Sequence, residues 1–132
     1  MEQTLVILKP EIVARGLVGR ILQRFEDKGL TIKSLALKQL ERETVEAHYA
    51  HHADKPFFQG LVDYMTSGPV VLAVLEGPQA IAVVRNLCGH TNPVEALPGT
   101  IRGDFSIELP ANAIHASDSP EAAQAEIQRF FG

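Results

Sequence analysis

Cysteine is nearly absent from the sequence. Cys88 is the single cysteine among 132 residues, so the chain has no partner for an internal disulfide and no pair of thiols for a metal site. Independence from disulfides is typical of proteins in a reducing compartment. We therefore expect this protein to act in the cytoplasm.

Long apolar runs and an excess of basic residues are also lacking. No apolar segment approaches the roughly 20 residues that a membrane-spanning helix needs, and the N-terminus lacks the basic and then apolar stretch of a secretory signal. The formal net charge is −4 at pH 7, whereas nucleic acids attract broadly basic surfaces. We expect neither a membrane nor nucleic acid as the main partner. A small anionic ligand held by a few cations remains compatible with this charge.

Several common catalytic motifs are missing. The sequence has no G-x-x-x-x-G-K-[ST] phosphate loop, no G-x-G-x-x-G after a strand, no H-E-x-x-H and no G-x-S-x-G. His51 and His52 are adjacent on an expected helix, so they point to different sides and form a poor chelating pair. Any chemistry must therefore come from residues dispersed along the chain.

The size and the 45% apolar content predict one globular domain spanning residues 1–132. Apolar and β-branched runs predict strands over residues 4–8, 30–40, 70–75 and 113–116. Helical spacing predicts helices from residue 17 to Gly29 and over 44–52, 56–66, 79–87 and 120–131, with Ser119 as the last N-cap. Without the helical hairpin at 44–66, the order is βαββαβ. This order indicates an α+β, ferredoxin-like fold with helices on one face of a four-stranded antiparallel sheet.

The segment from Gly89 to Ala111 has no periodicity and contains three prolines. We expect a long loop there, before the last strand. A structureless stretch of this length in a compact domain is either functional or disordered, and its threonines, asparagine and arginine favour function.

His115 is the strongest candidate for chemistry. It lies in Asn112-Ala113-Ile114-His115-Ala116-Ser117-Asp118-Ser119, between an apolar residue and a run of hydroxyl and carboxylate side chains. A histidine can act as nucleophile or base near neutral pH, although a lone histidine is more often structural. Glu126 follows eleven residues later, close enough to orient the imidazole across a strand-turn-helix, but its spacing alone favours an exposed helix glutamate.

Three cations are candidates for binding an anion. Lys9 ends the first strand, Arg85 lies in an otherwise apolar helix, and Arg102 lies in the long loop. Each has a simpler alternative: an exposed charge for Lys9, a side chain extended to solvent for Arg85, and an ion pair with Asp104 for Arg102. Together with donors such as Thr91 and Asn112, these residues suit phosphoryl transfer through a phosphohistidine, since such catalysis depends on positioning and charge.

The chain resembles the nucleoside diphosphate kinases over essentially its whole length. The matching segments are Leu8-Lys9-Pro10, Arg15-Gly16-Leu17-Val18-Gly19, Arg24-Phe25-Glu26, Pro56-Phe57-Phe58, Ser67-Gly68-Pro69-Val70-Val71, Leu75-Glu76-Gly77, Thr91-Asn92-Pro93, Pro98-Gly99-Thr100-Ile101-Arg102-Gly103-Asp104-Phe105 and Asn112-Ala113-Ile114-His115-Ala116-Ser117-Asp118. Such an ordered set is highly specific.

This resemblance implies a function and a set of site residues. The family transfers the γ-phosphate of a nucleoside triphosphate, mainly ATP, to other nucleoside diphosphates by a ping-pong mechanism, with Mg²⁺ on the phosphates, and its members are tetramers or hexamers. His115 matches the phosphorylated histidine, and Ser117 and Glu126 match its supports. Phe57 matches the aromatic on which the base stacks, with apolar contact from Leu61. The remaining matches hold phosphates, ribose and catalytic geometry: Lys9, Tyr49, Arg85, Thr91, Arg102 and Asn112.

The chain departs from the usual family pattern at three places. Glu11-Ile12 replaces Asp-Gly or Asp-Ala, Ala111 stands where arginine is common, and Ala116 replaces a glycine after the histidine. If position 116 needed a positive φ, alanine would be strained there. Two alternatives to an active kinase are a regulatory paralogue that binds nucleotides without turnover and a DNA-binding accessory protein. No expected site residue is missing, and the acidic charge disfavours DNA.

Overall fold

The computed structural model describes all residues from 1 to 132 and contains one four-stranded sheet. The elements are β1 (Glu2–Leu8), α1 (Pro10–Ala14), α2 (Val18–Lys28), β2 (Thr31–Lys38), α3 (Arg42–His48), η1 (Ala50–His52), α4 (Phe58–Met65), β3 (Val70–Gly77), α5 (Ala80–Cys88), η2 (Pro93–Glu95), α6 (Ile101–Phe105), β4 (Ile114–Ala116) and α7 (Pro120–Phe131). The strands lie in the order β2-β3-β1-β4, and every neighbouring pair is antiparallel. The predicted α+β, ferredoxin-like class is confirmed.

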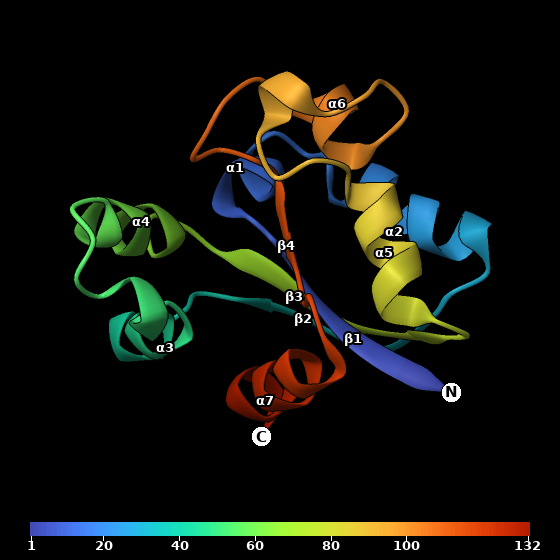
Figure 1. The fold of residues 1–132 in the computed structure, drawn as a ribbon, viewed down its shortest axis with the longest axis horizontal. Helices are drawn as coiled ribbons and strands as arrows, with labels where there is room; N and C mark the ends of the chain where they lie inside the picture. The colour runs from blue at the N-terminus through green and yellow to red at the C-terminus, as the bar shows by residue number, and fades with distance from the viewer.

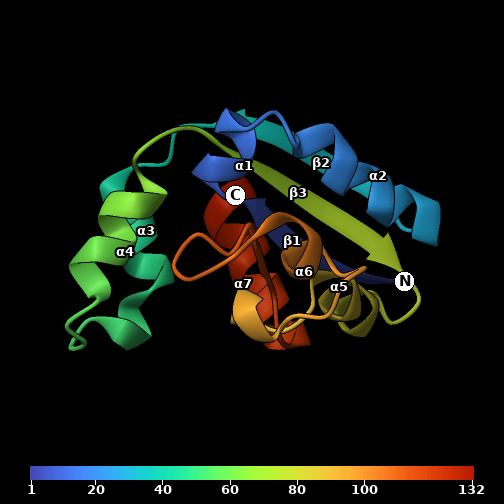
Figure 2. The same ribbon diagram turned by 90° about the horizontal axis from the view of Figure 1, so that it is seen from above.

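Helices cover both faces of this sheet, whereas the sequence analysis expected helices on one face. Side chains alternate along a strand, so Val6 and Leu8 of β1 face a core built with α1, α2 and α5, while Leu5 and Ile7 face a core built with α3, α4 and α7. Figures 1 and 2 show α3 and α4 at the opposite end of the long axis from α2 and α5. The expectation was wrong because β1 and β3 are buried on both faces, and the last helix supplies part of the second cover.

Local signals explain where the helices begin and end. Gly29 follows α2 with φ 107°, a left-handed conformation that glycine adopts without strain. Ser119 caps α7 by accepting the N–H of Ala122 at 3.0 Å. The helix α1 was not predicted, because the sequence analysis uses Pro10 only to end the first strand, although proline also suits the first position of a helix.

The segment from Gly89 to Ala111 is more ordered than predicted, since it contains η2 and α6. Thr100 caps α6 by accepting the N–H of Gly103 at 3.0 Å. A Cβ at position 103 would lie 1.9 Å from the carbonyl oxygen of Leu97, so only glycine permits this close approach. Helices of three and five residues are too short to produce a detectable apolar period.

Cys88 lies at the end of α5 inside the core and is 1% exposed. Burial raises the pKa of its thiol to about 11. None of the helices combines the length and apolar character needed to cross a membrane.

Candidate active site

β4 presents His115 to the face of the sheet covered by α3 and α7. Ile114 and Ala116, its neighbours on the strand, point into the other core, so the alternation of the strand directs His115 away from them. β4 pairs with β1 through Ile7 opposite His115. The side chain of His115 is 22% exposed, which leaves it supported by protein but open to a ligand.

Glu126 of α7 holds the imidazole in one orientation. Its Oε1 lies 2.9 Å from Nε2 of His115 and accepts a hydrogen bond from the Ser117 hydroxyl at 2.7 Å. Burial opposes ionisation of this carboxyl, but its hydrogen bond to His115, the His115 charge and the Ser117 hydroxyl together lower its pKa. A carboxylate on Nε2 keeps the ring proton there, and Nδ1 makes no hydrogen bond within the protein. The expected support of His115 is in place, and the alternative of an exposed helix glutamate was wrong.

The sequence analysis missed His48, which packs directly against His115. The two ring centroids are 4.6 Å apart with planes at 87°, and Tyr49 and Phe130 contact the same ring of His48 edge-on. Nη1 of Arg129 lies 3.1 Å from Nδ1 of His48. Burial first, and then the proximity of His115, lowers the pKa of His48 to about 3, so this ring is neutral. Its position three residues after the buried Val45 on α3 was the available signal for an inward-facing histidine.

A second group of predicted residues lies where β1 ends. Nζ of Lys9 donates to Oδ1 of Asn112 at 2.5 Å, and Nδ2 of Asn112 donates to the carbonyl of Thr91 at 3.0 Å. Lys9 is 6% exposed, so the alternative of an exposed charge was wrong. Burial first, and then the charge of Arg102, lowers the pKa of Lys9 to about 8, while Glu11 acts in the opposite direction. The backbone N–H of Lys9 also donates to the carbonyl of Ala113 at 2.9 Å, which joins the end of β1 to the segment just before His115.

The two arginines donate to backbone carbonyls. Arg102 is 6% exposed and donates to the carbonyls of Gly89, Asn112 and Ile114 at 2.7–3.2 Å. The suggested ion pair between Arg102 and Asp104 was wrong, because Asp104 pairs with Arg24 at 2.7 Å. Arg85 remains exposed, and its Nη1 donates to the carbonyl of Ala116 at 3.2 Å, next to His115.

Phe57 and Leu61 lie one turn apart at the start of α4. Phe57 is 52% exposed and contacts His52 edge-on, with ring centroids 5.1 Å apart, while Leu61 is partly buried against the core. An exposed aromatic face of this kind is suited to stacking with a planar ligand. Tyr49, in contrast, is 8% exposed, and burial followed by the charge of Glu126 raises the pKa of its hydroxyl.

The structure accommodates two departures from the usual family pattern, Ala116 and Glu11. Ala116 does not adopt a positive φ, so alanine is not strained there; Ala113 does, at φ 71°. The N–H of Ala113 donates to Oε1 of Glu11 at 2.8 Å. The longer side chain at position 11 therefore reaches from α1 to the segment that precedes His115. Nothing in the structure explains alanine at position 111.

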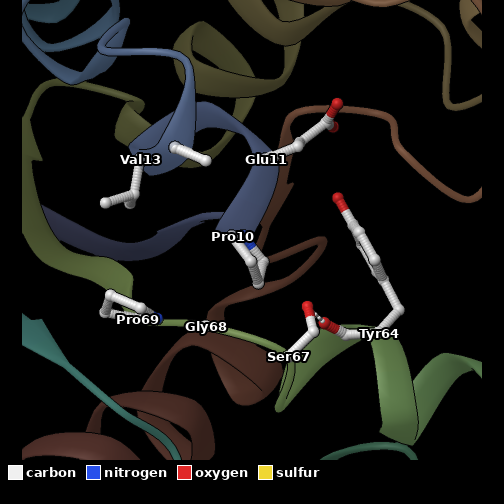
Figure 3. Close-up of a pocket in the computed structure, with 8 residues that line it drawn as sticks. Pro10, Glu11, Val13, Tyr64, Ser67, Gly68 and Pro69 are labelled. Atoms are coloured by element: carbon white, nitrogen blue, oxygen red, sulfur yellow. Dashed lines mark hydrogen bonds between the residues drawn. The ribbon is translucent and has the colours of Figure 1, made fainter.

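A cavity of about 330 Å³ lies beside α1 and the start of β3 (Figure 3). Pro10 and Glu11 line it from one side, and Tyr64 points toward Glu11 from α4. None of the predicted site residues lines this cavity. The cavity is therefore distinct from the site around His115.

Taken together, a histidine supported by a carboxylate on one ring nitrogen, beside a buried lysine and two arginines, defines a phosphotransferase that works through a histidine. Comparison with known proteins gives the family. The family model described as nucleoside diphosphate kinase matches residues 2–132. This chain belongs to the nucleoside diphosphate kinase family, and it is an enzyme that transfers phosphate between nucleotides through a phosphohistidine.

Individual relatives agree over nearly the full chain. A nucleoside diphosphate kinase of Nocardia farcinica is 60% identical over 131 residues, which cover 98% of this chain and 94% of that protein. A nucleoside diphosphate kinase of Archaeoglobus fulgidus is 56% identical, with coverage of 99% and 87%. Among solved structures, an enzyme of this name from Encephalitozoon cuniculi superposes with a TM-score of 0.98 at 42% identity, covering 100% of this chain and 90% of that one. The halophilic enzyme from Halobacterium salinarum, in complex with CDP, gives 0.96 at 47% identity, with coverage of 98% and 87%.

Proposed function

We propose that His115 is the residue that carries the phosphoryl group and that its Nδ1 is the attacking atom. The observation that supports this assignment is the contact of Nε2 with Glu126, 2.9 Å long, which leaves Nδ1 without a partner in the protein on a side chain that is 22% exposed. In the first half-reaction the Nδ1 lone pair forms the N–P bond while the bond from the γ-phosphorus to the bridging oxygen breaks. The nucleoside diphosphate leaves with the electron pair, and the second half-reaction is the reverse with another diphosphate.

We propose that residues around His115 stabilise the charge of the phosphates and position them for this step. Lys9 stands beside Asn112, and we propose that both face the transferring phosphate, while Arg85 and Arg102 draw the nucleotide phosphates toward His115. Tyr49 packs on His48 and thereby supports the ring that borders His115. Glu126 stabilises the positive charge that develops on the imidazole as the N–P bond forms.

Nucleotide recognition is proposed to depend little on the base. Phe57, with Leu61 one turn further on α4, offers an apolar face rather than hydrogen-bond donors and acceptors that read one base. Stacking accepts every base, because each has a π-face. The CDP complex of the Halobacterium salinarum enzyme supports a nucleotide ligand of this class. We propose ATP as the main donor and other nucleoside diphosphates as acceptors, in the cytoplasm.

Mg²⁺ is proposed to arrive with the nucleotide. Magnesium prefers six oxygen ligands, whereas the one cluster of potential metal ligands in the structure consists of two histidines and a glutamate. These residues do not fit a magnesium site, so the phosphates are the proposed ligands. When bound, Mg²⁺ neutralises part of the phosphate charge.

Labelling with γ-³²P-ATP tests the assignment. The wild-type protein with Mg²⁺ is expected to retain a label that is lost in acid and stable in alkali, and His115→Ala is expected to retain none. His90→Ala is the matched control, since His90 is an exposed histidine of the loop. Retention of the label by His115→Ala would overturn the assignment.

A further inference from the structure

One cluster of side chains could bind a metal ion, a property that the proposed phosphoryl transfer does not require. It consists of His48, His115 and Glu126. Each offers one nitrogen or oxygen atom, and these atoms all lie within 4.8 Å of one another. We propose that this cluster is an inhibitory binding site for Zn²⁺ or a similar divalent transition metal, separate from the Mg²⁺ of the nucleotide. The inhibitory part rests on the proposed role of His115; binding of the metal does not.

The geometry suits a tetrahedral ion with one open position. In a zinc site with bonds of about 2.0–2.2 Å, neighbouring ligand atoms lie roughly 3.4 Å apart. Nε2 of His115 lies 2.9 Å from Oε1 of Glu126, and one ligand atom from each of the three residues lies within 4.8 Å of the others, so modest shifts of the side chains would bring them to a common ion. With three protein ligands, the fourth position of the zinc ion is left for water or a phosphate oxygen.

The type of ligand selects the metal. Two imidazoles and one carboxylate suit zinc, whereas magnesium prefers oxygen ligands in octahedral geometry. The ligands come from three different elements, α3, β4 and α7, which the fold holds together. His48 is 7% exposed, so its ring is already ordered and loses little freedom when it binds a metal.

Binding of the metal blocks phosphorylation because it changes the tautomer of His115, so that Nδ1 carries a proton and no longer has a free lone pair. In the free enzyme Nε2 of His115 carries the proton shared with Glu126, and Nδ1 has the lone pair. When Nε2 gives its lone pair to the metal, the neutral ring keeps its single proton on Nδ1, and Glu126 binds the metal through the oxygen that accepted that proton. The proton moves from one ring nitrogen to the other, and no N–P bond forms while the metal is present.

Arg129 opposes this binding. Its guanidinium lies 3.1 Å from Nδ1 of His48 and places a positive charge beside the cluster. Because Arg129 is an exposed residue near the end of α7, it can move away when a metal binds, at an electrostatic cost. Removal of this charge is therefore expected to tighten zinc binding, the opposite of the effect of losing His48.

Metal binding is measured directly on the nucleotide-free protein with Mg²⁺ in excess. Titration calorimetry with Zn²⁺ is expected to give one site per chain, and Co²⁺ is expected to give the visible absorption of a tetrahedral centre. His48→Asn and His48→Phe, the latter keeping an aromatic ring against His115, are each expected to weaken Zn²⁺ binding by at least about tenfold, the scale seen when even supporting residues of a metal site are lost. Arg129→Gln is expected to strengthen it several-fold, and His51→Asn, which removes an exposed histidine, is expected to leave it unchanged.

The other possible results distinguish three claims: the metal site, its inhibitory effect and the role of His115. Equal zinc affinity in the wild type and both His48 variants, or loss of binding in His51→Asn, overturns the site. Normal labelling by γ-³²P-ATP with zinc bound at the cluster overturns the inhibition. Absence of label without zinc contradicts the proposed role of His115 instead, and the calorimetric result still stands alone.

Discussion

At the scale of single residues, the site depends on which nitrogen of His115 carries the proton. Glu126 fixes that choice through Nε2, and Ser117 and Leu5 fix Glu126: the Ser117 hydroxyl donates to the carboxylate and accepts the N–H of Leu5 at 3.3 Å. The orientation of His115, the proposed nucleophile, is thereby tied to the central strand β1. Because Glu126 contacts His115, we expect a loss of its charge to lower the rate of phosphoryl transfer more than the affinity for nucleotide.

The first prediction concerns Glu126→Gln. The amide can still accept from Nε2 but carries no charge to stabilise the imidazole as the N–P bond forms, so kcat is expected to fall about 100-fold or more, with KM little changed. Steady-state kinetics with ATP and a nucleoside diphosphate measures both constants. Glu121→Gln, an exposed glutamate of the same helix, should behave as the wild type; an equal loss in both variants would argue against a role for Glu126.

The second prediction concerns Lys9 and pH. The pKa of Lys9 is lowered to about 8, chiefly by burial, so the free enzyme loses this charge as the pH rises through 8. Because kcat/KM reports the ionisation of the free enzyme, it should decline above pH 8, while kcat declines less since bound phosphate favours the charged lysine. In Lys9→Arg the guanidinium remains charged, and the decline should disappear even if the absolute rate is lower. A flat wild-type profile up to pH 9.5 would contradict this.

At the scale of the elements, Arg102 connects the segment around α6 to the rest of the fold. It binds one carbonyl after α5, one before β4 and one within β4. A single buried guanidinium therefore orders the loop and the strand that carries His115. The phosphate-binding role proposed for Arg102 would therefore depend on the same side chain that orders this part of the fold.

The third prediction is that Arg102→Met lowers the free energy of unfolding by about 3 kcal/mol, since three buried carbonyls lose a charged donor. Urea denaturation at a fixed protein concentration measures the change. Arg42→Met provides the control, because Arg42 forms half-exposed ion pairs with Glu46 and Asp63, which contribute about 1 kcal/mol or less. Similar losses in the two variants would mean that Arg102 contributes no more than a surface charge.

The elements also show what the sequence can predict. All four strands and the helices with a repeated apolar face were located, because a period of two or of 3.6 is detectable over a long segment. The resemblance to the family predicted Ser117 and Glu126 as supports of His115, whereas the spacing of Glu126 alone favoured an exposed helix glutamate. His48 was missed because it approaches His115 only after α3 folds against α7. The partners of Arg102 were missed because backbone carbonyls leave no mark in the sequence.

At the scale of the whole molecule, the sheet ends in two edge strands, the long β2 and the three-residue β4. β2 lies at the edge of the order β2-β3-β1-β4, and its Leu35 and Leu37 are 53% and 66% exposed. An exposed apolar edge strand is a template for pairing with another chain. We propose that β2 contributes to the tetramer or hexamer implied by the resemblance.

The fourth prediction follows for the assembly. Analytical ultracentrifugation of the wild type should give a particle larger than the 14.4 kDa chain, and the double variant Leu35→Lys, Leu37→Lys should sediment as a smaller species. Ala53→Lys places the same charge on an exposed turn and should leave the assembly intact. If the double variant sediments as the wild type does, β2 is not part of an interface.

The buried position of Cys88 has a practical consequence. A thiol that is 1% exposed and has a pKa of about 11 reacts slowly with maleimides and iodoacetamides at neutral pH. The native chain thus has no readily reactive thiol that would compete with a cysteine introduced for site-specific labelling. With Ala53→Cys, a fluorophore on the connection between α3 and α4 would be the sole reporter, and its signal would follow any movement of this hairpin as a nucleotide enters.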